Sequence, residues 1–477
     1  MKRNKFRFLV VGTNFISENF ADAVDKVDRA CAVCGECGSG VTGGVSAGSE
    51  TASGDGARAA SSGGIAEAVP SCESLEAALS GDLFPIDMSR FCGDGYFPGA
   101  PGFGGCGISA VLSRKKETGE AFSSRCAAGA VTVCTLEEAA RFYEAGGFDA
   151  AYIASPNALH EVQSVYFLER GIPVLCEKPA AVNLSSFERI ADAAVRGGAF
   201  FAEAMRPAHD PAIDAIRRAV ELIAPVRMAR LEFSQYSSRY ARFLAGEPVN
   251  TFNPAMGNAA LLDLGVYAIS CALMLFGEPE TISPRSVFLE NGFEAAGSAA
   301  FAYPGFLCNI NYSKVCEGAS PSVILGEGGA VTVDRLSEPR EVKLRLGKNG
   351  VFHSVITGAP ENNMIYEIAD FIRICTGGTD GGAGARTSGT GVHMTADGAH
   401  ISGAGKNTTA DVAHTSGAGI APAVSSVRTV NAPSSLFAAA GKYPCTDGAA
   451  LLELSRAQCR IIDKICSETG IKFCEAK

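Results

Sequence analysis

The sequence predicts an α/β protein, with an N-terminal doubly wound parallel sheet and a C-terminal α+β domain built on a large, mostly antiparallel open sheet. Up to about residue 206, short apolar runs alternate with helical patterns, which is typical of a parallel sheet covered by helices on both faces. After residue 207, longer alternating stretches follow one another with few helices between them. This pattern favours antiparallel strands with one covered face.

The chain begins with a strand, a tight turn and a helix. Residues 6–11 form a near-continuous apolar run, as a strand buried on both faces requires. Gly12-Thr13-Asn14 is the turn, and apolar side chains then recur at helical spacing at Ile16, Phe20, Ala23, Val24 and Val27. This is the opening half of a dinucleotide-binding unit, in which the start of the helix offers N–H groups to a phosphate.

An insertion interrupts this unit. Residues 31–106 are rich in Gly, Ser and Ala, a composition that cannot build a dense core. The insertion opens with Cys31-x-x-Cys34-x-x-Cys37, but no fourth ligand has a matching spacing, so we expect no metal. The other cysteines of the 17 are scattered, as reduced and buried cysteines are. A second low-complexity insertion spans residues 376–433.

The remaining elements follow from periodicity. Parallel strands are expected at 108–112, 131–134, 150–154, 172–176 and 200–202, with helices between them. Capping-box spacing marks two helix starts, Thr135 to Glu138 and Ser185 to Glu188. After a helix at 212–222, strands are expected at 226–236, 286–289, 299–303, 307–312, 323–325, 330–333 and 341–346. A helix over 451–465 closes the chain, which we divide into domains 1–206 and 207–477.

Composition limits the partners. The 477 residues are 47% hydrophobic and carry a formal net charge of −10, which argues against nucleic acid. The sequence shows no apolar run of about 18 residues, and the apolar stretch at 6–11 is too short for a signal peptide. We therefore expect a cytoplasmic protein that does not bind a membrane.

The most informative motif is Glu177-Lys178-Pro179, which follows the apolar run 172–176. Ligands of an open parallel sheet lie outside the carboxyl ends of its strands. A lysine at such an end, followed by a proline that stops strand pairing, is aimed at a ligand. An ordinary surface lysine is the alternative interpretation. Upstream, Ser155-Pro156-Asn157-Ala158-Leu159-His160 follows the strand expected at 150–154.

These two motifs resemble those of the glucose-fructose oxidoreductase, inositol dehydrogenase and rhizopine-catabolism (Gfo/Idh/MocA) family. Two further stretches, Glu203-Ala204-Met205-Arg206 and Leu-Leu-Asp-Leu-Gly-Val-Tyr at 261–267, extend the resemblance over nearly the whole chain apart from the insertions. The combination is most similar to the dimeric dihydrodiol dehydrogenases and NADP-dependent xylose dehydrogenases. The resemblance implies a Rossmann domain and an NAD(P)-dependent dehydrogenase acting on CH–OH groups of a sugar, cyclic polyol or trans-dihydrodiol.

The first turn departs from the pattern G-x-G-x-x-G, because Asn14 and Ser17 replace the second and third glycines. Glycine there allows a positive φ, and asparagine is the next most tolerant residue for such a conformation. We expect the cofactor to be bound by Gly12, Thr13, Asn14, Phe15 and Ile16. A simple strand-to-helix turn is the alternative.

The choice of cofactor is predicted at the end of the second strand. NAD sites place an Asp or Glu there to bond the ribose 2′-OH, whereas this chain has Ser113-Arg114-Lys115-Lys116. A carboxylate repels a 2′-phosphate and an arginine pairs with it. Ser113 and Arg114 therefore predict NADP in preference to NAD. A solvated, basic helix start is the alternative.

The resemblance also implies the catalytic residues. Lys178 would lie beside the nicotinamide and the reacting carbon, where a cation polarises the oxygen. Many family members supply a histidine four residues after an aspartate, and here Tyr267 stands four residues after Asp263, one helical turn away. Tyr267 would be the general acid/base, assisted by Lys178 because a free phenol has a pKa near ~10. Asp263 would orient substrate hydroxyls or hold the lysine, and a helix residue at the domain interface is the alternative for Tyr267.

The remaining predicted cofactor contacts lie at later strand ends: Ser155, Pro156, Asn157, His160, Glu177 and Arg206. By resemblance, the 155–157 segment lies near the nicotinamide ribose, and His160 is either a cofactor contact or a structural histidine. Arg206 either contacts the nicotinamide or substrate, or pairs with a carboxylate such as Asp210. His209 has the same ambiguity.

Two classes of function fit these residues. One is an enzyme that acts on a small polyol or sugar. The other is a regulator on the same scaffold, in which the bound nucleotide signals rather than reacts. The presence of both Lys178 and Tyr267 favours an enzyme, because a sensor needs neither. An uncovered apolar face of the second sheet would suit a homodimer or homotetramer.

Overall fold

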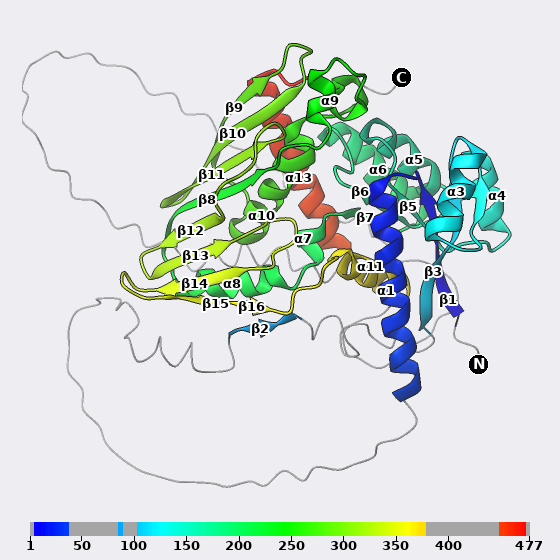
Figure 1. Ribbon diagram of the computed structural model, residues 1–477, viewed down its shortest axis with the longest axis horizontal. Coiled ribbons are helices and arrows are strands. Elements are labelled where there is room, and N and C mark those ends of the chain that lie inside the picture. The colour runs from blue at the N-terminus through cyan, green and yellow to red at the C-terminus, as the bar shows by residue number, and fades with distance from the viewer. Residues whose placement is uncertain (1–3, 38–83, 89–102, 378–447, 474–477) are drawn as a thin grey trace, which may run out of the picture.

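The computed structural model describes residues 4–37, 84–88, 103–377 and 448–473 (Figure 1). Within these residues, a six-stranded sheet and an eight-stranded sheet lie at opposite ends of the molecule, with helices between them and around them. The first sheet is parallel and the second is mostly antiparallel, so the predicted fold class is confirmed.

The parallel sheet has β1 (Asn4–Val11) in its interior, paired with β3 (Phe103–Leu112) on one side and β5 (Ala150–Ile153) on the other. The full order is β4-β3-β1-β5-β6-β7, with β4 (Val131–Val133), β6 (Val174–Glu177) and β7 (Phe201–Ala204). Strand order therefore reverses between β1 and β5, the kind of switch point at whose carboxyl edge ligands bind.

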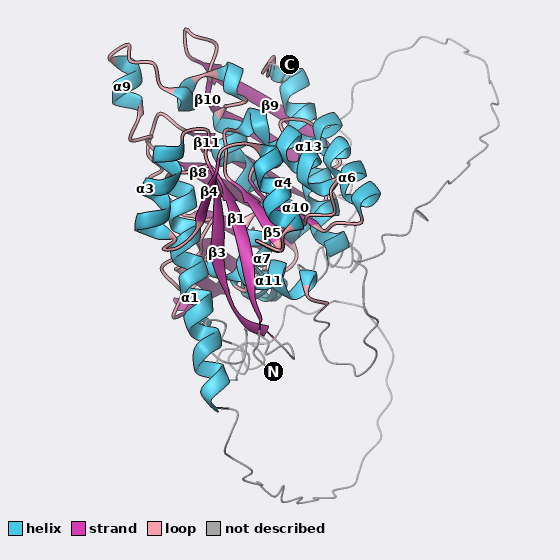
Figure 2. Ribbon diagram, turned by 90° about the vertical axis from the view of Figure 1, so that its right-hand side faces the viewer, coloured by secondary structure: helices cyan, strands magenta, loops and turns pink. Residues whose placement is uncertain are grey.

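Helices cover both faces of this sheet (Figure 2). On one face, α1 (Phe15–Cys37) and α3 (Lys116–Cys126) bury Phe20 and Phe122. On the other face, α4 (Leu136–Glu144), α5 (His160–Leu168) and α6 (Leu184–Gly197) pack on a second apolar layer. A short 3₁₀ turn, η2 (Asn157–Leu159), leads into α5.

Of the two helix starts predicted from capping-box spacing, the one at Thr135 is confirmed. The Glu138 N–H donates to Thr135 Oγ1 (3.1 Å), and Glu138 Oε2 accepts from the Cys134 N–H. The prediction for Ser185 was wrong, because α6 begins earlier. Its cap is Asn183, whose side chain accepts from the Ser186 N–H (2.8 Å).

The first insertion is flanked by more regular structure than its composition indicates. α1 continues to Cys37, because Ala30 and Cys31 still pack against the core, and β3 already begins at Phe103. Inside the insertion, β2 (Ile86–Asp87) pairs with β16 (Ile356–Thr357), and Met88 is buried. Residues 38–83 and 89–102, and the second insertion from residue 378, lie outside the described residues.

Two helices, α7 (Arg206–His209) and α8 (Ala212–Leu222), lead from the parallel sheet to the second sheet. The strands of the second sheet are β8 (Val226–Ser234), β9 (Thr281–Phe288), β10 (Glu294–Tyr303), β11 (Phe306–Ser313), β12 (Ser322–Gly326), β13 (Gly329–Val333), β14 (Val342–Leu346) and β15 (Phe352–Ser354). They are ordered β15-β14-β13-β12-β8-β11-β10-β9, and β8 with β11 is the one parallel pair among these described strands.

Between β8 and β9, the chain forms α9 (Tyr240–Leu244), η3 (Asn250–Phe252), η4 (Pro254–Met256), η5 (Leu261–Gly265) and α10 (Val266–Phe276). Every residue of α10 is buried. The stretch Pro254–Phe276 is long and apolar enough to resemble a membrane span, which the sequence analysis did not predict. However, 94% of its most apolar window is buried within the protein, which is the environment of a core helix.

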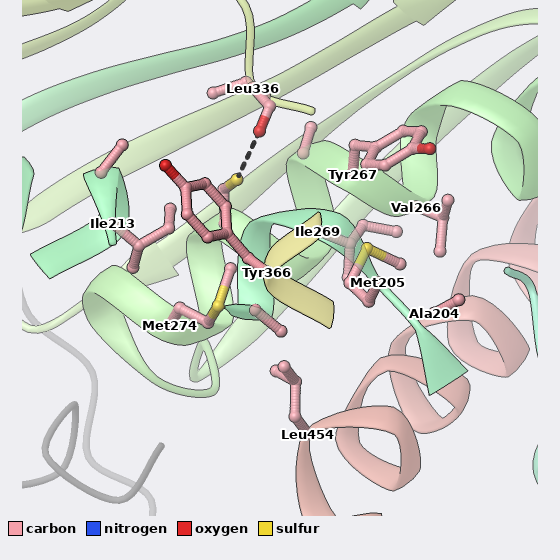
Figure 3. Close-up of a cluster of buried hydrophobic side chains, with 14 of the residues drawn as sticks. Ala204, Met205, Ile213, Val266, Tyr267, Ile269, Met274, Leu336, Tyr366 and Leu454 are labelled. Carbon is pink, nitrogen blue, oxygen red and sulfur yellow. Dashed lines mark hydrogen bonds between the residues drawn. The ribbon is translucent and has the colours of Figure 1, made fainter. Parts of the chain in front are cut away.

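The last two helices return to the parallel sheet. α11 (Met364–Cys375) packs on α1, and α13 (Gly448–Thr469) packs on α6 and β7. Figure 3 shows side chains from both halves of the chain in one apolar cluster, among them Met205, Ile269, Tyr366 and Leu454. The two predicted domains therefore share a continuous core, and their boundary at residue 206 stays a prediction.

Candidate active site

The three predicted catalytic side chains meet at the carboxyl end of β6. Lys178 directly follows β6, and its Nζ donates to Asp263 Oδ1 (2.9 Å) and to the backbone oxygen of Asp263 (2.8 Å). The same Nζ lies 4.7 Å from the centre of the Tyr267 ring, within the range of a cation–π contact. Lysine and tyrosine thus converge although they come from different halves of the chain.

Asp263 lies in η5, a single π-helical turn that runs directly into α10. Such turns are rare and are frequent at functional sites. The second sheet holds this turn in place, because Glu294 on β10 accepts from the Leu261 N–H (2.9 Å). Gly265 is needed because a Cβ there would stand 2.8 Å from the ring of Tyr312 on β11.

A second lysine, which the sequence analysis missed, completes this cluster. Lys314 follows β11, and its Nζ donates to Asp263 Oδ2, opposite Lys178 on Oδ1. Its side chain is only 9% exposed. Burial, then repulsion from Lys178 and Arg239, lowers the pKa of the Lys314 ammonium from 10.5 to about 7. No motif marks Lys314, since it is a lone lysine after an alternating strand.

Tyr267 is buried beneath these groups and packs against the ring of Phe233 on β8 (5.3 Å between centroids). A second cation faces it, because Arg206 at the start of α7 interacts electrostatically with Tyr267. Burial opposes the charge of Arg206, but its attraction to Tyr267, Glu367 and Glu177 raises the pKa of the guanidinium.

The ion-pair partner of Arg206 is Glu338 (3.9 Å), not Asp210, which had been one expectation. Asp210 instead accepts from the side chain of Asn363 (2.8 Å). His209 bonds Asp370 on α11 (3.0 Å), which makes it a buried structural contact.

Two buried carboxyl groups interact electrostatically with Arg206. Glu177, the last residue of β6, accepts from the hydroxyl of Tyr152 (2.6 Å). Glu367 on α11 is fully buried, and neither of its side-chain oxygens has a hydrogen-bond partner. Burial, then repulsion from Glu177, raises the pKa of Glu367 well above its usual range, and attraction to Arg206 acts against this shift.

The β1–α1 turn has the features of a phosphate-binding turn. Gly12 adopts a positive φ of 102°, and a Cβ there would lie 2.8 Å from Ala154 O at the end of β5. Asn14 replaces a glycine for a reason other than the predicted conformational tolerance. Its Oδ1 caps the Ser17 N–H (3.0 Å), and its Nδ2 donates to Ala154 O (2.7 Å).

Thr13 is half-buried in this turn, and Phe15 and Ile16 form the first turn of α1. Backbone N–H groups at the first turn of a helix have no partner within the helix. They are available to an anion at the switch point of the sheet.

The end of β3 carries no carboxylate. The Ser113 hydroxyl donates to Lys115 O (2.9 Å), whereas Arg114 is exposed. Among the described residues, no acidic side chain forms an ion pair with Arg114 within 4.0 Å. This strand end and the close approach at Gly12 fit a bound dinucleotide.

The Ser155–His160 segment links the two motifs. His160 is buried, with Nδ1 2.8 Å from Pro179 O and Nε2 2.8 Å from Ser155 O. Asn157 Nδ2 donates to Gly257 O (3.0 Å), on the segment before η5. Pro156 immediately precedes η2. Both ring nitrogens of His160 therefore contact backbone oxygens of the two motifs, which favours its interpretation as a structural histidine.

Together, the predicted cofactor residues follow β1, β3, β5, β6 and β7, all at the carboxyl edge of one parallel sheet. A phosphate-binding turn, a basic strand end and a lysine–tyrosine pair at this edge define a nucleotide-dependent oxidoreductase scaffold. Comparisons with known proteins specify this class further. A model of the oxidoreductase family with an NAD-binding Rossmann fold (GFO_IDH_MocA) matches residues 99–204, and a model of the GFO/IDH/MocA C-terminal domain matches residues 216–332.

A scyllo-inositol 2-dehydrogenase (NADP(+)) of Bacillus subtilis is 34% identical over 267 residues, covering 56% of this chain and 80% of that protein. A trans-1,2-dihydrobenzene-1,2-diol dehydrogenase of Mus musculus is 30% identical over 241 residues, covering 48% and 68%. The chain belongs to the Gfo/Idh/MocA oxidoreductase family. The expectation of an NAD(P)-dependent dehydrogenase acting on CH–OH groups is confirmed at this level.

Solved structures agree on the fold. A 3-ketoreductase from Actinomadura kijaniata, in complex with NADP and TDP-benzene, aligns with a TM-score of 0.54 over 78% of this chain and 91% of that chain. Its sequence identity of 16% makes this a likeness of fold alone.

We expect Glu294→Gln to change the pH dependence of stability. Burial raises the pKa of Glu294 from 4.5 to about 7, against the hydrogen bonds that it accepts. Because the folded pKa is the higher one, this carboxyl contributes most stability below its unfolded pKa, and the contribution is lost as the pH rises through the folded pKa. The free energy of unfolding should therefore fall by about 3 kcal/mol over this pH range.

Thermal unfolding between about pH 4 and about pH 8 measures this effect. The Tm of the wild type should fall relative to that of Glu294→Gln as the pH rises. Glu327→Gln, at an exposed residue paired with Arg227, is the matched control and should follow the wild type. Parallel curves for wild type and Glu294→Gln would contradict the prediction.

Proposed function

We propose that the protein is an NADP-dependent dehydrogenase that transfers a hydride between nicotinamide and a hydroxyl-bearing carbon of a sugar, cyclic polyol or trans-dihydrodiol. The observation that carries the proposal is the Lys178 ammonium, held by Asp263 and lying 4.7 Å from the centre of the Tyr267 ring. The dehydrogenases of Bacillus subtilis and Mus musculus support this range of substrates.

In this proposal, Tyr267 moves the proton. When the alcohol is oxidised, the phenolate of Tyr267 accepts the hydroxyl proton, and when the carbonyl is reduced, the phenol donates it. Lys178 and Arg206 stabilise the phenolate because both place positive charge beside it. Asp263 holds Lys178 rather than acting as a base, since both of its carboxylate oxygens already accept from lysines.

The residues at the carboxyl edge would hold the cofactor. The Gly12 turn and the first turn of α1 would receive the pyrophosphate, and Arg114 would pair with the 2′-phosphate. When bound, the nicotinamide supplies the hydride acceptor or donor. The NADP(+) in the name of the Bacillus subtilis relative supports NADP in preference to NAD.

We expect Lys178→Ala and Tyr267→Phe to lower kcat by roughly 100- to 10,000-fold, because each removes part of the proton-transfer machinery. Absorbance of NADPH, followed with a panel of polyols, sugars, dihydrodiols and carbonyl compounds, measures turnover. Binding of NADPH, followed by fluorescence, should persist in Tyr267→Phe.

Lys343→Ala, at a half-exposed lysine paired with Glu341 on the far part of the second sheet, is the control and should keep full activity. Binding of NADPH without turnover of any compound, together with no effect of Lys178→Ala, would instead favour a nucleotide-sensing regulator.

Arg114→Asp should reverse the cofactor preference. The carboxylate would repel a 2′-phosphate and could bond a free 2′-OH. The Kd of NADPH should rise about tenfold or more, while that of NADH should not rise. Arg141→Asp, at an exposed residue on α4, is the matched control. An unchanged ratio of the two Kd values would show that Arg114 does not determine the preference.

The expected cytoplasmic location stays a prediction. We also propose that the protein self-associates through the open face of the second sheet. Met228, Leu307 and Leu325 lie side by side on β8, β11 and β12 and are 48%, 47% and 39% exposed. A cross-strand aliphatic cluster of this kind is typical of an interface.

Met228→Glu should shift the protein toward the single chain in sedimentation equilibrium, because it places a charge inside the cluster. Leu244→Glu, at an exposed leucine on α9, should leave the mass unchanged. A wild-type mass of one chain would rule out the proposed assembly.

A further inference from the structure

Lys314 is fixed at the site by its own backbone. Its N–H donates to Ala295 O (2.9 Å), and its carbonyl accepts from the Ser237 N–H (3.0 Å). The side chain therefore leaves the end of β11 from a defined point and reaches Asp263 Oδ2 in a nearly buried position. An ammonium in such a place loses most of its hydration, which is costly unless the ammonium is paired.

One carboxylate is thus shared by two ammonium groups. Lys178 uses Oδ1 and the backbone oxygen of Asp263, and Lys314 uses Oδ2. A pair of Lys178 and Asp263 alone would be neutral, and Asp263 would offset much of the positive potential that Lys178 directs at Tyr267. With Lys314 included, the cluster has a net charge of about +1 beside the phenol when both lysines are protonated.

Other charged groups act on this cluster, among them the buried carboxyl of Glu203, which interacts electrostatically with Lys178. Lys314 faces Lys178, Asp263 and the exposed Arg239, which precedes α9. Tyr267 faces Lys178 from the end of β6 and Arg206 from α7. The carboxyl groups of Glu177 and Glu367 interact electrostatically with Arg206, and their attraction partly offsets its charge.

We propose that Lys314 is a positioning residue of the reaction, which holds and neutralises Asp263 so that Lys178 keeps its positive charge available to the Tyr267 phenolate. This inference rests on the proposed role of Tyr267 as the acid/base. The proton travels between the substrate hydroxyl and the Tyr267 oxygen, and Lys314 is not part of that path. Its effect is on the free energy of the phenolate.

The test compares Lys314→Met and Lys314→Gln, which remove the charge, with Lys314→Arg, which keeps it. Oxidation requires the phenolate, so kcat rises with pH through the ionisation of Tyr267. This rising part of the plot of kcat against pH, the acid limb, should move to higher pH by about 1 unit in the Met and Gln variants. In the Arg variant it should return toward the wild-type position. KM should change much less than kcat at low pH.

Lys343→Met is the control, because it removes a lysine of the same sheet that is paired with Glu341 far from the site. A purely structural role for Lys314 would lower Tm or the rate at every pH without moving the acid limb. That result in both Lys314→Met and Lys314→Gln would overturn the inference.

A second readout needs no substrate. The ultraviolet absorbance of phenolate, titrated in each protein and in the same protein carrying Tyr267→Phe, isolates the ionisation of Tyr267. It should occur at higher pH in Lys314→Gln than in the wild type. A shifted titration without any turnover would refute the proposed reaction but support the electrostatic coupling. Turnover with an unshifted titration would refute the coupling and leave the reaction intact.

Discussion

The ion pair between Lys178 and Asp263 links the two halves of this protein. Burying opposite charges costs more than their attraction returns unless every donor and acceptor is satisfied. Here a third group contributes, because Lys314 occupies the carboxylate oxygen that Lys178 leaves. The ends of β6 and β11 and the π-helical turn η5 are therefore fixed relative to one another, and the position of Tyr267 one turn later follows from them.

Buried carboxyl groups hold the loops around this pair. Glu203 on β7 accepts from the Ala180 N–H (2.8 Å), two residues after Lys178, and also from Ser455 and Gln458 on α13. Burial raises the pKa of Glu203 despite these bonds. Glu294 plays the same part for η5. Within the Glu203–Arg206 motif, Glu203 therefore holds the segment that follows Lys178, and Arg206 interacts with Tyr267.

Periodicity predicted most of the strands because burial on both faces leaves a short apolar run, as β5 and β6 show. Lys178 and Arg114 could be predicted to lie at the same edge, because topology places all parallel carboxyl ends together. Lys314 and the caps at Asn14 and Asn183 were missed, since each depends on a partner that spacing does not mark. Asp263 and Lys314 are 51 positions apart, so no local sequence pattern marks their contact.

The sites where the two insertions join the fold explain how the catalytic geometry can tolerate them. α1 runs back toward the amino edge of the parallel sheet, where Asp28 bonds the Cys106 N–H (3.1 Å), so the first insertion is attached at that edge. The second insertion connects α11 to α13, and the start of α13 at Gly448 lies against Phe200, just before β7. Both attachments are at the edge opposite Lys178 and Arg114. Because loop closure costs only about 0.6 kcal/mol for each doubling of length, long connections there need not disturb the cluster at the carboxyl edge.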